Sequence, residues 1–328
     1  WITHLCAPAF VFLSGTSAWL SLNRRFLLKR GVALLLIEFT IVNFALSFDI
    51  RFRLQIFEVI AAIGTGMILL SFLSRLSTKT ILVLALLLIF GHDLVLRIPM
   101  PKDPAVSVPG SLLFAPNAFP LGAGRLFVVA YPILPWLGIM LAGFSAGRLF
   151  TLPVQQRTRI FVRLGVASLA LFVLLRLSNW YGDPFPWSVQ RNAVYTFLSF
   201  MNVTKYPPSL LFALVTLGIL FLILAAAEAK DNPLTRRLIV YGRVPLFFFI
   251  VHLYLIHGLL IAIVLLQGYP WSALDFSPFK FGRPDGAGLS LSQIYLVWAC
   301  VVVALYPVCS WYGRCKALHK EKRWLRYL

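Results

Sequence analysis

The sequence predicts an all-α, polytopic integral membrane protein with about nine transmembrane helices. Two observations carry this prediction. Of the 328 residues, 60% are hydrophobic and only 12% are charged, whereas soluble domains are about one quarter charged. The apolar residues also gather in repeated runs, such as residues 31–48 and 211–227, near the ~20 residues that a helix needs to cross a bilayer. We therefore treat residues 1–328 as a single transmembrane domain.

The boundaries of the spans follow from the apolar runs and the charges that interrupt them. The expected spans cover residues 4–21, 31–48, 54–74, 80–97, 126–148, 161–178, 207–227, 244–267 and 291–313. The sequence begins at Trp1, with neither a methionine nor a signal peptide. We therefore expect a missing first span upstream, and ten or more spans in the full-length protein.

The basic residues predict the orientation. Most of the 30 Lys and Arg lie in the C-terminal tail and in the loops that follow the odd-numbered spans. The positive-inside rule places this side, and with it the C-terminus, in the cytoplasm. The loops of residues 98–125, 179–206 and 268–290 then face outside. The net charge of +19 does not indicate nucleic-acid binding, because the basic residues are dispersed between apolar runs.

The histidines and cysteines do not predict a metal site. His252 and His257 are five residues apart, about 140° around an ideal helix, so they do not share a face. The four cysteines have no metal-ligand spacing. They are Cys6, Cys300, Cys309 and Cys315.

Ionisable side chains inside the expected spans are the first candidates for function. They are His4, Glu38, Glu58, His92, Asp93, His252 and His257. Each costs about 2.5 to 3.5 kcal/mol in hydrocarbon, so it must face protein or water. His252 lies near mid-membrane, and both an interhelix hydrogen bond and a chemical role are open for it. We take His252, His4 and His257 as candidate catalytic residues. For His92 and Asp93, at the end of a span, we expect an interfacial role. We expect Glu38 to be protonated and to form hydrogen bonds.

The segment NVTKYPPSL, residues 202–210, is the most unusual polar run. Its two prolines suit the first turn of the following span. This predicts Lys205 and Tyr206 at the outer surface with a helix N-terminus behind them, and Ser209 within the first turn. Such a site suits an anionic or sugar-like group, and we take these three residues as candidates for acceptor binding. A snorkelling lysine beside an interfacial tyrosine is the alternative.

Four segments resemble the heparan-α-glucosaminide N-acetyltransferase-like transmembrane proteins, in particular bacterial members of unassigned function. They are THLCAPAFVFLSGTSA (3–18), YPILPWLGIMLAGFSAGRLF (131–150), NVTKYPPSLLF (202–212) and YGRVPLFFFIVHLYLIH (241–257). The resemblance implies a membrane-embedded acetyltransferase, and its bacterial members imply a bacterial inner (plasma) membrane as the location. Such an enzyme takes an acetyl group from cytoplasmic acetyl-CoA and delivers it to an amino sugar or glycan across the membrane.

The resemblance also bears on single residues. The histidine that handles the acetyl group in the family lies upstream of the segment that matches residues 3–18, so it has no counterpart in this sequence, and His4 is not its match. His252 falls on a histidine position shared with the animal members. Arg148 and Arg243, at expected cytoplasmic mouths, are candidates for binding the phosphates of CoA, although the positive-inside rule also explains them. The oligomeric state is not predicted.

Two other functions remain open at this point. A proton-coupled transporter or permease could use the buried histidines and glutamates as a proton relay. A non-catalytic membrane scaffold is the third possibility. The transporter predicts substrate flux without an acyl donor, the enzyme predicts consumption of acetyl-CoA, and the scaffold predicts neither.

Overall fold

The computed structural model describes residues 2–99, 101, 103–228, 232–319, 321–322, 325 and 327. The chain is an α-helical polytopic membrane protein, as predicted. In the described part of the chain, seven helical segments are long and apolar enough to cross a membrane. They are Arg24–Ser47, Thr78–Val95, Ile133–Thr151, Val154–Ser178, Leu210–Ala227, Pro245–Leu266 and Leu291–Leu318. The expected count of about nine is not confirmed, because α1 (Ile2–Leu20) and α4 (Val59–Leu73), at the first and third expected spans, fall outside this set.

The chain divides into two compact units. The first comprises residues 1–35, 57–117 and 129–230. The second comprises residues 36–56, 118–128 and 231–328. Each unit therefore collects segments that are far apart in the sequence.

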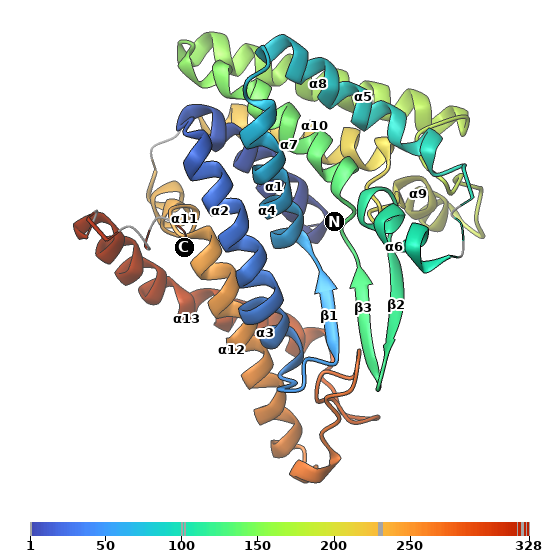
Figure 1. Cartoon of the computed structure of the whole chain (residues 1–328), viewed down its shortest axis with the longest axis vertical. Helices are drawn as coiled ribbons and strands as arrows, with labels where there is room; N and C mark the ends of the chain where they lie inside the picture. The colour runs from blue at the N-terminus through green and yellow to red at the C-terminus, as the bar shows by residue number, and fades with distance from the viewer. Residues whose placement is uncertain are drawn as a thin grey trace. The chain divides into compact units, whose positions relative to one another are not determined.

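The first unit is built around α7 (Ile133–Ala146), whose Trp136 is fully buried. The helices α1, α4 and α10 (Leu210–Ala227) run parallel to one another and to α7 (Figure 1). The helix α5 (Thr78–Val95) runs the opposite way, because its last turn meets the start of α10. The helix α8 (Val154–Ser178) packs antiparallel on α10.

Shorter elements complete the first unit. The helix α2 begins at Arg24 and ends at Ile37, and a 3-10 helix, η2 (Gly147–Thr151), continues α7. The segments that connect the spans hold two short helices, α6 (Pro104–Leu113) and α9 (Ala193–Met201). The loops expected at residues 98–125 and 179–206 are therefore partly helical.

Two glycines allow α1 and α7 to approach closely. A Cβ on Gly143 would lie 1.9 Å from the carbonyl oxygen of Phe12, and one on Gly15 would lie 2.0 Å from that of Met140. Across the same contact, Thr16 donates a hydrogen bond to the carbonyl oxygen of Gly143 at 2.9 Å. Small residues and hydroxyl hydrogen bonds of this kind stabilise helix pairs in membranes.

A small β-sheet was not predicted from the sequence. Its strands are β1 (Leu54–Phe57), β2 (Asn117–Gly122) and β3 (Arg125–Val129), and β3 lies between the other two (Figure 1). Consequently, the spans expected at 54–74 and 126–148 start later, with helix beginning at Val59 and Ile133. A short apolar run preceding a helix has no period that distinguishes strand from helix, which explains the error.

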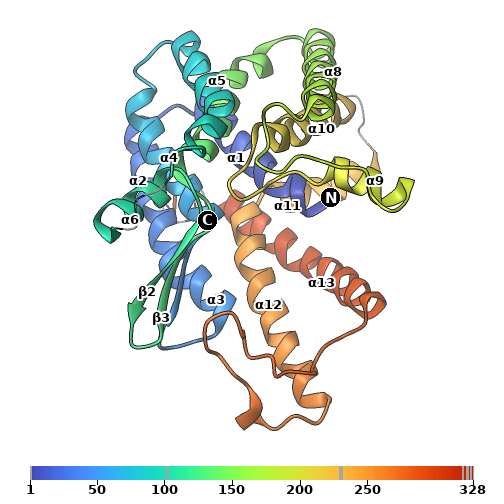
Figure 2. The ribbon, with the colours of Figure 1, turned by 90° about the vertical axis from the view of Figure 1, so that its right-hand side faces the viewer.

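The second unit contains the helices α11 (Pro233–Gly242), α12 (Pro245–Leu266) and α13 (Leu291–Leu318), with a short 3-10 helix, η3 (Trp271–Ala273), between α12 and α13. Figure 2 shows α12 beside α13, and the two helices share an apolar core that includes Val244, Leu305 and Cys309.

A π-helix, η1 (Glu38–Val42), followed by α3 (Asn43–Ser47), also belongs to the second unit. Asn43 donates to the carbonyl oxygens of Glu38 at 2.8 Å and of Ile56 at 3.0 Å. Its own side-chain oxygen accepts the backbone N–H of Ile56 at 2.6 Å. The five-residue spacing of Glu38 and Asn43 thus becomes a direct contact that ties the π-helix to β1.

Candidate functional site

Five polar side chains of the first unit gather where parallel helices begin. His4 lies in the first turn of α1, Glu58 is the N-cap of α4, Tyr131 precedes α7, and Lys205 and Tyr206 precede α10. We call these five residues the amino-terminal cluster. Helix N-termini carry a partial positive charge, so several of them at one end favour an anionic or electron-rich group there.

Electrostatic and ring contacts link the members of the amino-terminal cluster. The charge of Lys205 lies close enough to interact with His4 and with Glu58. The hydroxyl oxygens of Tyr131 and Tyr206 are 3.5 Å apart, and their rings meet edge to face. Burial raises the pKa of Tyr131, and the hydrogen bond to Tyr206 and the nearby Glu58 raise it further. The Tyr131 phenol therefore stays protonated at neutral pH and can donate a hydrogen bond.

Asp183 holds the turn that carries Lys205. One carboxylate oxygen accepts the backbone N–H of Thr204 at 2.8 Å and the hydroxyl of Ser209 at 2.8 Å. The other accepts the Thr204 hydroxyl at 3.0 Å. Ser209 is the N-cap of α10, and its hydroxyl oxygen accepts the backbone N–H of Phe212. Ser209 is 1% exposed and its hydroxyl is already hydrogen-bonded, so this side chain is suited to hold the turn in place. A direct contact between Ser209 and the sugar acceptor stays a prediction.

A second buried residue fixes the loop that leads to this turn. Arg176, on α8, donates to the carbonyl oxygens of Phe185, Ser199, Phe200 and Asn202 at 2.7 to 3.0 Å. Its guanidinium also lies 4.0 Å from Asp183. Neither Asp183 nor Arg176 was predicted as functional from the sequence, although Arg176 interrupts an apolar run, which is a signal for function in a membrane span.

His92 and Asp93 are buried, whereas the sequence favoured an interfacial role for them. They are 5% and 7% exposed. The Oδ2 of Asp93 accepts the backbone N–H of Leu210 at 3.0 Å. The sequence could not reveal this contact, because its partners are 117 positions apart.

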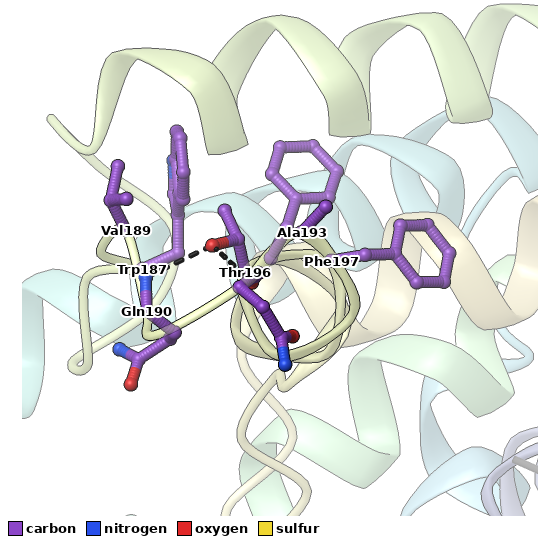
Figure 3. A pocket seen from close by; sticks show the side chains of 8 residues that line it. Trp187, Val189, Gln190, Ala193, Thr196 and Phe197 are labelled. Carbon is purple, nitrogen blue, oxygen red and sulfur yellow. Dashed lines mark hydrogen bonds between the residues drawn. The ribbon is translucent and has the colours of Figure 1, made fainter.

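Two hollows lie beside α9. The first, of about 530 Å³, is lined by apolar side chains such as Trp187, Val189 and Phe197 (Figure 3). Its Thr196 hydroxyl already accepts from the backbone N–H of Gln190 and donates to the carbonyl oxygen of Asn192. This hollow therefore offers few polar groups to a sugar.

The second hollow, of about 500 Å³, has a more polar wall and includes His4 of the amino-terminal cluster. Gln190, Tyr195, Ser199 and Asn202 line it together with His4. It provides room for a polar ligand next to the imidazole.

The other predicted site residues have different surroundings. His252, on α12, is half-buried, and its Nδ1 lies 3.1 Å from the carbonyl oxygen of Phe248. His257 is buried, with its ring stacked on Phe48 at 4.0 Å. Arg243 and Arg148 are exposed. His252, His257 and Arg243 belong to the second unit, whereas His4, Arg148 and the Lys205 turn belong to the first.

The family follows from a comparison with known protein families. The profile described as Heparan-alpha-glucosaminide N-acetyltransferase, catalytic, matches residues 1–180, which is more than half of the chain. The chain belongs to this family. The region that matches the acetyltransferase profile contains His4, Glu58, Asp93, Tyr131 and Arg176. No curated protein and no solved structure matched the chain.

Metal ligands do not gather in the described part of the chain. No group of three or more His, Cys, Asp or Glu side chains there could hold a metal ion.

Proposed function

We propose that the protein transfers an acetyl group from acetyl-CoA to the amino group of a sugar or glycan on the opposite side of the membrane. The family supports acetyl transfer in a membrane protein. The observation that carries the proposal is the amino-terminal cluster. There the charge of Lys205 interacts with His4, and His4 lines a hollow large enough for a sugar.

The charges of the cluster suit attack by an amine. The positive charge of Lys205 and the helix N-termini disfavour an ammonium ion, so a bound amino group loses its proton more easily. In the transfer, the amine nitrogen forms a bond to the acetyl carbon, the bond from that carbon to the acyl carrier breaks, and a base takes the amine proton. His4 is our candidate for that base. Lys205 and the Tyr131 hydroxyl stabilise the negative charge on the carbonyl oxygen.

The donor binds at the cytoplasmic face in this proposal. Arg148 and Arg243 are exposed, and guanidinium groups bind phosphates well. The acetyl group then crosses the bilayer on a histidine that serves as a transient carrier. The cluster faces outward from a bacterial inner membrane, and the C-terminus faces the cytoplasm.

The proposed orientation can be tested by labelling single cysteines. Asp103 is exposed before α6, and Leu318 is exposed at the end of α13. With the four native cysteines replaced by serine, Asp103→Cys should react with an impermeant maleimide from outside the cell, and Leu318→Cys should not. Equal labelling from outside would contradict the orientation.

The activity itself is tested with the full-length protein in liposomes. Radiolabelled acetyl-CoA on the cytoplasmic side and glucosamine on the other should yield N-acetylglucosamine. Lys205→Ala should raise the KM for glucosamine while donor binding is unchanged. Lys29→Ala is the matched control, because Lys29 is exposed on α2. Glucosamine flux without acetyl-CoA, and no acetylated product, would favour the transporter instead.

A further inference from the structure

The end of α5 holds a buried carboxylate that the amino-terminal cluster does not use. Asp93 is 7% exposed, and only its Oδ2 is engaged, by the backbone N–H of Leu210. Its Oδ1 finds no hydrogen-bond partner among the described residues. Buried polar atoms are nearly always hydrogen-bonded, so this oxygen points to a ligand that supplies the missing donor.

Asp93 also lines a cavity of about 320 Å³. The wall includes Arg97, one helical turn further along the chain, together with Asn179, Trp180 and Asp183. Small-molecule sites range from about 300 to 1,000 Å³. The cavity therefore suits a ligand of the size of one sugar ring.

Most polar groups of the wall are already bonded to the protein. Both oxygens of Asp183 accept hydrogen bonds from Thr204 or Ser209. The side chain of Asn179 donates to the carbonyl oxygen of Trp187 at 2.8 Å and accepts its backbone N–H at 3.1 Å. These bonds make the wall rigid, which lowers the entropic cost of binding. Asp93, in contrast, has a buried oxygen, Oδ1, without a hydrogen-bond partner among the described residues.

The chemistry of the wall selects the ligand. Asp183 is already paired with Arg176, whose guanidinium lies 4.0 Å away. Asp93 forms no salt bridge among the described residues, so its carboxylate can attract a cation. An ammonium group could donate a charge-assisted hydrogen bond to Oδ1. Trp180, which is 81% exposed, presents an indole face that could cover the C–H face of a sugar ring. The guanidinium of Arg97 lies 5.9 Å from the ring centre of Tyr181. Its N–H groups can donate hydrogen bonds to the hydroxyl groups of the sugar.

We propose that this cavity binds an amino-sugar unit through its ammonium group, with the carboxylate of Asp93 as the hydrogen-bond acceptor. The choice of a sugar as the carrier of the amine rests on the proposed function. An amine held as ammonium has no lone pair and cannot attack an acetyl group. The unit in this cavity is therefore recognised without being acetylated, in contrast to the unit beside Lys205, whose positive charge favours a neutral amine.

Calorimetric titration of the full-length protein, without acetyl-CoA, tests this site directly. Glucosamine should bind at least tenfold more tightly than glucose, which lacks the amine, and than ethanolamine, which lacks the ring. Asp93→Asn keeps an oxygen for the Leu210 N–H but loses the charge, so it should weaken glucosamine binding at least tenfold. Asp103→Asn is the control, because Asp103 also caps a helix but is exposed and lies outside this cavity. It should leave binding unchanged.

A second variant keeps the test decisive if Asp93→Asn does not fold. Trp180→Ala removes the exposed indole and should weaken glucosamine and glucose alike. Equal binding of glucose and glucosamine, equal binding of ethanolamine and glucosamine, or an unchanged Asp93→Asn variant would each overturn the proposal. Glucosamine binding that depends on Asp93, but without acetyl transfer, would retain this site and overturn the proposed function. Acetyl transfer without glucosamine binding at Asp93 would retain the proposed function and overturn this site.

Discussion

The carboxylate of Asp93 accepts the backbone N–H of Leu210, with 3.0 Å between the two atoms. This bond ties the last turn of α5 to the first residue of α10. The first N–H groups of a helix have no partner within the helix, so α10 depends on groups outside the helix for them. Asp93 and Ser209 satisfy two of these groups and thereby fix the position of the turn that carries Lys205.

Replacing Asp93 by alanine should destabilise the protein. The buried N–H of Leu210 would lose its acceptor, at a cost of about 1–3 kcal/mol. Asp93→Asn should cost less, because an amide oxygen can still accept this bond. The measurement is the apparent melting temperature in detergent, with Asp103→Ala as an exposed capping control. A loss for Asp93→Ala no greater than that for Asp103→Ala would show that the buried bond contributes little.

Arg176→Lys should loosen the segment between Phe185 and Asn202. One ammonium group cannot reach the four carbonyl oxygens that the planar guanidinium holds. Limited proteolysis should therefore cut this segment faster in the variant. Arg163→Lys is the matched control, because Arg163 is exposed on the same helix. Similar cleavage of the two variants would mean that other contacts hold the segment.

The sequence was sufficient for features that depend on neighbouring residues. The apolar runs predicted the membrane class and most of the long helices, because each run lies within one element. The helix N-terminus behind Lys205 was also predicted. Its details differ, because Pro207 and Pro208 precede the helix, and Ser209 is its N-cap rather than part of its first turn.

Features that depend on distant pairs were not accessible from the sequence. Asp183 meets Ser209 only after the loop between them folds back, and Tyr131 meets Tyr206 across 75 positions. The strands β1 and β3 pair through backbone groups, which leave no mark in a hydropathy pattern. Lys205 could be placed at a surface, but its charged neighbours His4 and Glu58 could not be identified.

Gly143→Ala should strongly reduce folded yield. The new Cβ would lie 1.9 Å from the carbonyl oxygen of Phe12, which is backbone and cannot move without shifting α1. Gly91→Ala, in α5, is the control, because a Cβ there meets no atom within 4 Å. Size-exclusion profiles of the two purified variants compare their folding. A normal monodisperse peak for Gly143→Ala would contradict the close contact of α1 and α7.

His252 remains the candidate in the second unit for which a substitution is most informative. Its Nδ1 lies 3.1 Å from the carbonyl oxygen of Phe248. If Nδ1 carries the proton and donates this bond, then Nε2 of the neutral ring is left as an acceptor and can serve as a base. His252→Ala should then abolish acetyl-CoA-dependent transfer in the full-length protein with a nearly normal folded yield. His252→Gln should also be inactive, because glutamine can form hydrogen bonds but does not titrate near neutral pH.

His257→Gln is a useful comparison, since it removes the ring stacked on Phe48 and should reduce stability more than the catalytic rate. Full activity of His252→Gln would show that His252 has only a structural role, such as its hydrogen bond to Phe248 within α12, and its catalytic assignment would be wrong.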